Sequence, residues 1–277
     1  MSINDEFFVR FWGVRGSIPC PGNSTKRYGG NTSCIEIGAG GQTLLFDAGT
    51  GLYQYGCNKE NQKNLSAKLF MTHFHYDHIW GWPNFLPNRK SENKFHIYGG
   101  TLDLVHSVEN IMRGLLNDSS VGFEMKNDRA ELIFSEFRPG SNIDLSKDLL
   151  ISTIPLSHPD CAVGYKIEFN GRSICYLTDH EHGDKGNSEE LIEFVSGTDI
   201  VIYDSTYTDE EYMNHKGWGH STWQEGARLC NLADAKTFVA FHHDPKHDDN
   251  KMDSIAHDLE VIRPNSVVAK EGLVLKI

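Results

Sequence analysis

The chain has 277 residues, of which 39% are hydrophobic, so it is long enough to bury a substantial core. Its 26 Lys and Arg residues stand against 38 Asp and Glu residues, which gives a formal net charge of −12. This acidic balance argues against a generic binder of nucleic acids or anionic membranes, because such binding depends on basic patches.

The sequence predicts a cytoplasmic protein without a membrane partner. No apolar run approaches the ~18 residues of a membrane span, and the stretch MSINDEFFVRFWG lacks the charged-then-apolar pattern of a signal peptide. The six cysteines are scattered without a Cys-x-x-Cys pair. This spacing predicts neither a disulfide framework nor a thiolate zinc site.

The first half of the chain is predicted to be rich in strands. Extended runs cover FFVRFWGV (7–14) and SCIEIGAGGQTLLFDAG (33–49), the second with a glycine turn in its middle. LSAKLFM (65–71) and KFHIYGG (94–100) are two further predicted strands. From Thr101 onward apolar residues recur at helical spacing, which predicts one amphipathic helix.

The second half repeats this pattern. CAVGYKIEFNGRSICYLTD (161–179) predicts a hairpin turning at Asn-Gly, followed by a short helix at 188–197. A buried strand is predicted at 198–206, a helix at 222–235 and a long strand at 236–244. Strands followed by helices in both halves predict two packed sheets with helices outside them.

The stretch MTHFHYDHIWGW (71–82) follows a predicted strand and contains His73, His75, Asp77 and His78. Imidazole and carboxylate are ligands that zinc, manganese and iron accept. The spacing lets His73 and His75 point toward one cation while Asp77 and His78 turn toward a second. A solvated histidine-rich loop is the alternative, but so dense a cluster costs stability unless its groups are coordinated or hydrogen-bonded.

This stretch resembles the metallo-β-lactamase fold family, whose His-x-His-x-Asp-His signature is matched without a gap from His73 to His78. The resemblance implies an α/β fold, an αββα four-layer sandwich of two packed mixed β-sheets with flanking helices. It implies a single domain over residues 1–277. The run LLFDAGTG also matches the family and implies that Asp47 supports the metals from beneath.

The resemblance implies further ligands after later strands: His158 in LSH, Asp179 in CYLTD, and His242 or His243 in VAFHHD. His242 is favoured because the family's last strand ends in one ligand histidine. Two divalent metal ions are then expected, with zinc first and manganese or iron as alternatives. The implied ligand set is His73, His75 and His158 for one metal, Asp77, His78 and His242 for the other, and Asp179 as the bridge.

IVIYDST followed by GHST narrows the resemblance to the phosphodiesterase branch that includes tRNase Z and cyclic-nucleotide phosphodiesterases. It implies that His220 is the general acid and Asp204 its orienting partner, with Asp77 counted both as a ligand and as a catalytic residue. Two metals would lower the pKa of a bridging water and clamp the phosphoryl oxygens while an acid protonates the leaving oxygen. A helix-capping turn is the alternative role for His220.

The expected substrate is a small phosphodiester, in the first place a cyclic nucleotide or a related cyclic phosphate. The residues between His158 and Asp179 are predicted to form a tight hairpin, which leaves no place there for the glycine- and proline-rich arm with which tRNase Z grips tRNA. Trp218 is a candidate for stacking on a base. Relatives commonly form homodimers, but the sequence does not fix whether this chain forms one.

Two other polar segments leave alternatives open. Arg15, Lys26 and Arg27 lie in a glycine-rich stretch that predicts either a phosphate-receiving loop or a surface turn. HHDPKHDDN (242–250) favours a solvated loop over a rim above the metals.

Two alternative functions remain. One is metal-dependent hydrolysis of a lactone, thioester or β-lactam on the same scaffold, because loops choose the substrate. The other is a non-catalytic metal-binding or sensor protein.

Overall fold

The computed structural model describes residues 6–101, 107–117 and 129–277, and within them the strands form two mixed sheets of seven strands each. The first sheet contains, in spatial order, β14 (Val274–Lys276), β1 (Phe7–Gly13), β2 (Cys34–Ala39), β3 (Gln42–Phe46), β4 (Ser66–Met71), β5 (Lys94–Gly100) and β6 (Glu131–Phe137). The second contains β13 (Val267–Val268), β12 (Thr237–Phe241), β11 (Ile200–Asp204), β10 (Arg172–Leu177), β9 (Ala162–Phe169), β8 (Leu149–Leu156) and β7 (Asn142–Ser146).

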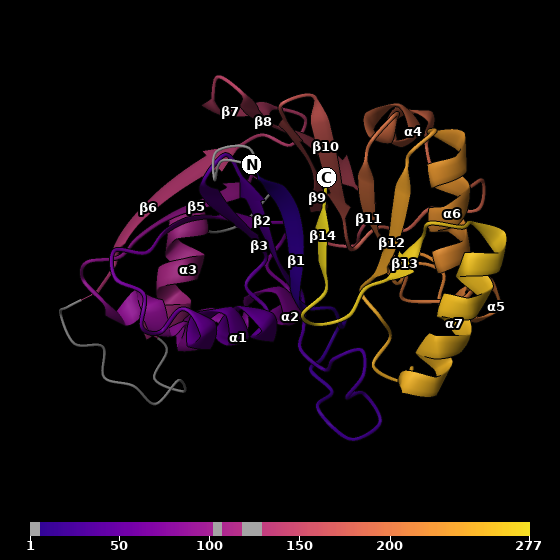
Figure 1. Ribbon diagram of the computed structural model, residues 1–277, viewed down its shortest axis with the longest axis horizontal. Coiled ribbons are helices and arrows are strands. Elements are labelled where there is room, and N and C mark those ends of the chain that lie inside the picture. The colour runs from indigo at the N-terminus through magenta and orange to yellow at the C-terminus, as the bar shows by residue number, and fades with distance from the viewer. Residues whose placement is uncertain (1–5, 102–106, 118–128) are drawn as a thin grey trace.

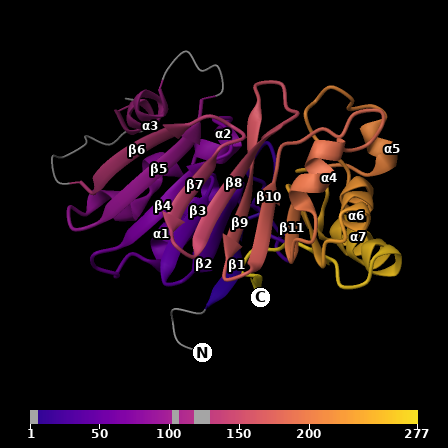
Figure 2. The same cartoon turned by 90° about the horizontal axis from the view of Figure 1, so that it is seen from above.

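Helices cover the outer face of each sheet (Figures 1 and 2). The first sheet is covered by α1 (Thr50–Asn58) and α3 (Val108–Asn117), and the second by α4 (Glu189–Val195), α6 (Trp223–Leu232) and α7 (Asp249–Ile262). The short helices are α2 (Tyr76–Ile79), η2 (Trp82–Asn84), η3 (Leu86–Arg89) and α5 (Asp209–Tyr212). The architecture is the expected αββα four-layer sandwich.

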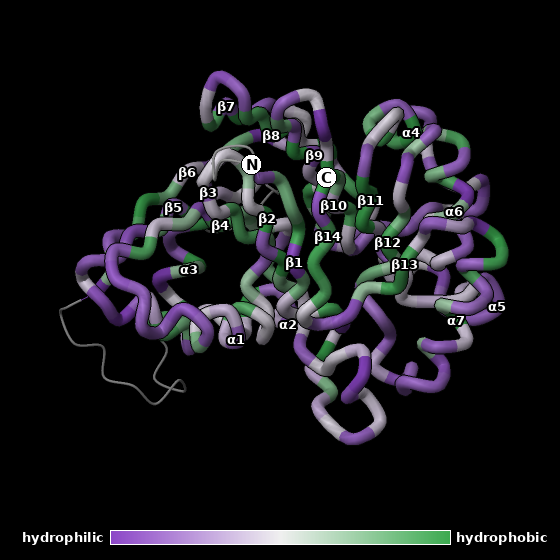
Figure 3. Tube along the Cα trace, in the orientation of Figure 1, coloured by the Kyte–Doolittle hydropathy of each residue, from purple (hydrophilic) through white to green (hydrophobic). Residues whose placement is uncertain are grey.

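Three apolar clusters join the four layers. The central cluster fills the space between the two sheets, where Phe46 of β3 packs against Phe70 of β4 and against Tyr165 and Tyr176 of the opposite sheet. The other two clusters lie between each sheet and its own helices. Strands such as β11 and β12 are buried on both faces, so they are hydrophobic along most of their length (Figure 3) rather than alternating.

The direction of the strands brings chemically reactive segments together. β3 and β4 are parallel, as are β10, β11 and β12. β8 runs in the same direction as β10, because each is antiparallel to β9. Carboxyl ends of parallel strands meet at one edge of a sheet, where open α/β sheets bind their ligands. The segments after these six strands are therefore neighbours.

The structure adds elements at the end of the chain that the sequence patterns did not predict. Helix α7 follows residue 248, and the last strand, β14, returns to the first sheet to pair with β1 through Phe8 and Lys276. The helix expected from Thr101 is described over Val108–Asn117, whereas residues 102–106 lie outside the described residues. Every described helix is too short or too polar to cross a bilayer.

Replacing Phe46 with alanine is expected to lower the free energy of unfolding by ~3–5 kcal/mol, because the change leaves a cavity between the two sheets. Leu232→Ala is the control, since Leu232 is 69% exposed on α6 and such surface changes stay within ~0.5 kcal/mol. Chemical denaturation followed by circular dichroism measures both. A Phe46→Ala effect no larger than that of Leu232→Ala would contradict the core position of Phe46.

Candidate metal centre

Three histidines from two strand ends form the first group of possible ligands. His73 and His75 follow β4, and His158 follows β8. One nitrogen of each lies within 4.8 Å of the corresponding nitrogens of the other two. His75 Nδ1 and His158 Nε2 are 3.1 Å apart, and His73 Nε2 is buried without a hydrogen-bond partner among the described residues.

The outer nitrogen of each of these imidazoles is held by the protein. His73 Nδ1 lies 3.1 Å from the Thr72 hydroxyl, and His75 Nε2 lies 2.8 Å from the carboxylate of Asp160. The Gly219 carbonyl accepts a hydrogen bond from His158 Nδ1 at 2.9 Å. Partners of this kind orient metal-ligating histidines and fix their tautomer, so that the inner nitrogen presents its lone pair.

The second group contains Asp77, His78, Asp179 and His242, all of them buried. His78 Nε2 lies 3.2 Å from Asp77 Oδ2 and 3.1 Å from Asp179 Oδ2. His242 Nε2 lies 3.3 Å from the same two oxygens. Two imidazoles and two carboxylates thus converge on one point, and the two groups together contain all seven predicted ligand residues.

Asp179 lies between the two groups. Its Oδ1 is 3.8 Å from His73 Nε2 and 3.9 Å from His158 Nε2, whereas its Oδ2 faces His78 and His242. One carboxylate therefore presents one oxygen to each group. This is the arrangement that a bridging ligand requires.

The second group also has outer partners. Asp47 Oδ2 lies 2.9 Å from His78 Nδ1, and the same carboxylate accepts hydrogen bonds from Thr72 and from Tyr176 of the opposite sheet. His242 Nδ1 lies 3.1 Å from the Thr206 hydroxyl. Asp47 therefore lies beneath the cluster, at the position that the resemblance implies.

The choice between the last two histidines follows from their orientation. His242 belongs to the second group, and its ring stacks between those of His78 and His220. The neighbouring His243 turns the other way, and its Nε2 donates to the carbonyl of Ala269 at 2.8 Å. His242 is therefore the candidate ligand, and His243 is a buried residue outside the two groups.

Three of these residues occupy left-handed backbone conformations just after their strands. The φ angles are 61° for Asp47, 58° for Asp179 and 63° for His242. Such angles are uncommon outside glycine, although Asp and His adopt them more readily than most residues. Unusual backbone conformations of this kind cluster at functional sites, where they aim a side chain.

His220 and Asp204 form a buried pair beside the second group. His220 Nδ1 donates to Asp204 Oδ2 at 2.9 Å, and the same nitrogen lies 3.9 Å from Asp179 Oδ1. Burial lowers the pKa of His220, but the carboxylates of Asp204 and Asp179 outweigh it and raise that pKa to about 9. The ring is thus anchored through one nitrogen while its other nitrogen is left for the pocket.

Asp204 and His220 also belong to a third possible ligand group, together with Asp179 and His242. The hydrogen bonds to Asp204 argue against a ligand role, because its oxygens accept from both the backbone N–H and the hydroxyl of Thr206, and from Ser221 N, Asp179 N and His220 Nδ1. A carboxylate has about four lone-pair sites. Asp204 is therefore saturated by donors and serves as an orienting residue.

The electrostatics of the cluster match a site built for cations. Burial lowers the pKa of His73 well below its ordinary value and lowers that of His158, which keeps both imidazoles in the neutral form that binds metals. Burial also acts to lower the pKa of His78, but the carboxylates of Asp179, Asp77 and Asp47 hold it well above its ordinary value. A cation at the second group would take over the charge balance that this proton provides.

The donor set fits divalent cations such as zinc. Buried nitrogens of His73 and His78 lack hydrogen-bond partners within the described part of the chain, although buried polar groups are normally paired. Both face the points where the other donors converge. Imidazole with carboxylate is a ligand chemistry shared by zinc, manganese and iron, so the donor set does not choose among them.

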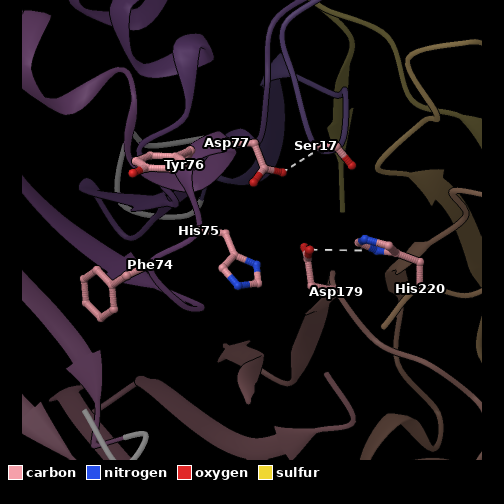
Figure 4. A pocket seen from close by; sticks show the side chains of 7 residues that line it. All are labelled: Ser17, Phe74, His75, Tyr76, Asp77, Asp179 and His220. Carbon is pink, nitrogen blue, oxygen red and sulfur yellow. Dashed lines mark hydrogen bonds and ion pairs between the residues drawn. The ribbon is translucent and has the colours of Figure 1, made fainter. Parts of the chain in front are cut away.

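A pocket of about 310 Å³ opens over the cluster. Its lining residues are Ser17, Phe74, His75, Tyr76, Asp77, Asp179 and His220 (Figure 4). Phe74 and Tyr76 lie on one side, His220 lies on the other, and His75 and Asp179 lie between them.

Sequence reasoning missed the segment that crosses the second group. Gly16 passes so close to His242 that a Cβ atom there would lie 2.4 Å from the imidazole ring. The next residue, Ser17, has a φ of 60° and donates its backbone N–H to Asp77 Oδ2 at 2.8 Å. The glycine-rich stretch was the available signal, but it predicts either a phosphate-receiving loop or a surface turn and does not point to Asp77.

Arg15 anchors this segment instead of meeting a ligand. Its guanidinium is fully buried and donates to the backbone carbonyls of Gly29, Asp244 and His247. Arg27 is also engaged, in an ion pair with Asp253 of α7. The buried position of Arg15 fits neither of the two alternatives, a phosphate-receiving loop or a surface turn.

The expectation of a solvated loop over 242–250 is also wrong for two of its members. His247 is buried, with its Nε2 2.9 Å from Glu211 Oε1. Asp249 is buried and accepts hydrogen bonds from the backbone N–H groups of Arg27 and Tyr28. Asp248 caps the N-terminus of α7 through Lys251 N. The segment is an ordered connection behind the cluster.

A short strap, Gly217–His220, connects His158 of the first group with the acid candidate His220. Gly219 has a φ of 83°, and a Cβ atom there would lie 2.3 Å from His158 Nδ1, so only glycine fits this close approach. Its carbonyl orients His158, and the next residue is His220.

Glu181 holds this strap in place. Its carboxylate accepts from Gly217 N at 2.7 Å, Gly219 N at 2.8 Å and the Tyr212 hydroxyl at 2.9 Å. Burial raises the pKa of Glu181, but these donors outweigh it and lower the pKa below its ordinary value. No sequence motif predicts this role, because the carboxylate accepts hydrogen bonds from backbone N–H groups whose positions depend on loop conformation.

Comparison with known proteins places this geometry in a family. Residues 42–243 match the family described as beta-lactamase superfamily domain. Ribonuclease Z of Pyrococcus horikoshii is 27% identical, with 86% of this chain and 87% of that protein covered. Ribonuclease BN of Cronobacter sakazakii is 23% identical, with 84% and 89% covered.

Solved structures share the fold at low sequence identity. The metallo-beta-lactamase fold protein YhfI from Bacillus subtilis has a TM-score of 0.71 at 18% identity, with 99% of this chain and 100% of that chain covered. A diphosphatase of the PhnP family has a TM-score of 0.70 at 17% identity, with 98% of each chain covered. Zinc-bound PqqB from Methylobacterium extorquens has a TM-score of 0.69 at 17% identity, with 98% and 100% covered. The chain thus belongs to the beta-lactamase superfamily and is a hydrolase of the metallo-β-lactamase fold.

Proposed function

We propose that the protein is a dinuclear metal-dependent phosphodiesterase that hydrolyses a small phosphodiester, with a cyclic nucleotide or a related cyclic phosphate as the first candidate. The observation that carries this proposal is the His220–Asp204 pair, at 2.9 Å, on the wall of the pocket. The leaving group of an alkyl diester departs as an alkoxide, which needs a proton. A positioned imidazole is the side chain that most often supplies one.

Two divalent cations are assigned to the two groups. His73, His75 and His158 would hold one, and Asp77, His78 and His242 the other, with Asp179 giving one oxygen to each. Zinc is the first candidate, with manganese or iron as alternatives. When bound, the cations supply positive charge against the phosphoryl oxygens and acidify water.

The residues of the chain itself position and protonate the substrate. Asp204 accepts a hydrogen bond from His220 Nδ1, which fixes the ring and leaves Nε2 for the leaving oxygen. The Ser17 N–H donates to Asp77 Oδ2 and so orients this carboxylate toward the second group. The saturated carboxylate of Asp204 stays in place while His220 exchanges its proton with the pocket.

The pocket favours a small substrate over an RNA. Its volume of about 310 Å³ is near the lower end of the range for small-molecule sites. In place of an arm between His158 and Asp179, the chain forms the hairpin of β9 and β10 with a turn at Asn170–Gly171. The net charge of −12 also disfavours a polyanion. The relatives named ribonuclease Z make precursor tRNA the competing substrate to test.

Turnover of a substrate panel tests the proposal. Protein purified without chelator is expected to hydrolyse bis-p-nitrophenyl phosphate and at least one cyclic nucleotide, with about two metals per chain on the same sample. Precursor tRNA, a lactone, a thioester and a β-lactam complete the panel. Two metals without diester hydrolysis would overturn the proposed reaction, and preferential cleavage of precursor tRNA would overturn the proposed substrate size. Metals without turnover of any substrate would favour a sensor.

Asp179→Asn is expected to reduce the metal content from about two ions per chain to one or fewer and turnover by at least ~10²-fold, because an amide is a weaker ligand that cannot bridge with negative charge. Elemental analysis and diester turnover measure the two effects. Asp144→Asn, on the exposed face of β7, is the matched control and should leave both unchanged. Retention of both metals in Asp179→Asn would contradict the bridging position.

His220→Gln is expected to lower kcat by ~10²–10⁴-fold on an alkyl diester while both metals stay bound. The loss should be much smaller on bis-p-nitrophenyl phosphate, because p-nitrophenolate leaves without protonation. Steady-state kinetics on both substrates, with metal analysis, measures the difference. Equal losses on the two substrates would show that His220 is not the acid.

A further inference from the structure

Two aromatic side chains, which we call the wall, line the side of the pocket opposite His220. Phe74 and Tyr76 form this wall, with His75 and Asp179 between them and His220 (Figure 4). Tyr76 is 67% exposed, and its ring stacks on that of Trp80 at a centroid distance of 5.7 Å. Trp80 is itself 42% exposed. A supported aromatic face thus stands in solvent at the mouth of the site.

The position of this wall is fixed by the candidate ligands. Phe74 lies between His73 and His75 in the chain, and Tyr76 lies between His75 and Asp77. The flanking side chains are oriented by Asp160 and by Ser17. A group that packs on the wall is therefore held at a constant distance from the two metal-binding groups, which makes the wall suitable for positioning a substrate.

The charge of the pocket limits what can bind. Its lining residues include two carboxylates, Asp77 and Asp179, and neither lysine nor arginine. Bound metals would then be the main source of positive charge near a phosphoryl group. A diester carries one negative charge at the phosphorus, whereas a phosphomonoester carries two. The lining therefore favours a monoanionic diester over a monoester or a chain of phosphates.

The inference rests on the proposed phosphodiesterase function and names its substrate class and the direction of cleavage. We propose that Phe74 and Tyr76 receive a flat aromatic group, of the nucleobase class, on the ester that the phosphorus retains, while the other ester oxygen faces His220. Water adds its oxygen to phosphorus, the opposite P–O bond breaks, and the leaving oxygen takes its electron pair and a proton from His220. One proton of the water then reprotonates His220. The other enters the medium or stays on the phosphomonoester.

The test compares two diesters with the same leaving group. Thymidine 5′-(p-nitrophenyl phosphate) presents a base on the retained ester, and methyl p-nitrophenyl phosphate presents a methyl group. The wild-type protein is expected to use the thymidine ester with a kcat/KM at least ~10-fold higher, the scale of one base–aromatic stack. p-Nitrophenyl phosphate, a monoester, is expected to be poorer than both.

Variants of the wall separate the outcomes. Tyr76→Ala and Phe74→Ala are expected to raise KM for the thymidine ester by ~10-fold and to leave the methyl ester unchanged, whereas Tyr76→Phe should behave as the wild type. Tyr53→Ala is the matched control, because Tyr53 is 41% exposed on α1 and does not line the pocket. Metal content is measured for each variant, so that a lost cation is not mistaken for a lost stack.

The failures are distinguishable. Turnover of both diesters with equal KM changes in the wall variants, or a selective loss in Tyr53→Ala, overturns this inference and leaves the phosphodiesterase proposal standing. An equal kcat/KM for the monoester overturns the charge argument and with it the substrate class. Failure of the wild-type protein, loaded with metals, to hydrolyse either diester overturns the phosphodiesterase proposal and this inference together.

Discussion

The burial of several carboxylates in one small volume is the constraint on which the rest of the structure depends. Four aspartates are buried close together, and each lies beside an imidazole. His78 is near Asp47, Asp77 and Asp179, and His220 is near Asp204. Buried charges destabilise a fold unless they are paired or coordinated. Each carboxylate therefore meets imidazole nitrogens or several hydrogen-bond donors, and two sheets rather than one are needed to deliver so many partners to one place.

The strand ends bear the conformational cost of this arrangement. Asp47, Asp179 and His242 turn into left-handed conformations within two residues of the ends of their strands, which costs about 1–3 kcal/mol for each residue. The central core between the sheets lies immediately behind them, where Phe46 and Tyr176 pack, and Tyr176 also donates to Asp47. A regular, tightly packed core and an irregular rim of polar residues are thus parts of one structure.

The sequence predicted the parts of the site that a local pattern encodes. His73 to His78 lie within six residues, so their proximity follows from chain connectivity, and the two-sheet architecture follows from the order of strands and helices. His158, Asp179 and His242 were placed by resemblance, because nothing in their spacing brings distant strand ends together. The roles of Ser17, Asp160 and Glu181 were not predictable, since each acts through a loop whose conformation depends on tertiary packing. The same is true of Asp249, which accepts from the backbone of residues 27 and 28, and of His247, which contacts Glu211 of α5.

The strap held by Glu181 has a consequence for how the site can change. Gly219 orients His158, and the adjacent His220 is the candidate acid, so both depend on the position of one peptide segment. A shift of that segment disturbs cation affinity and proton donation in the same movement. The two properties therefore cannot be tuned separately at this point of the fold.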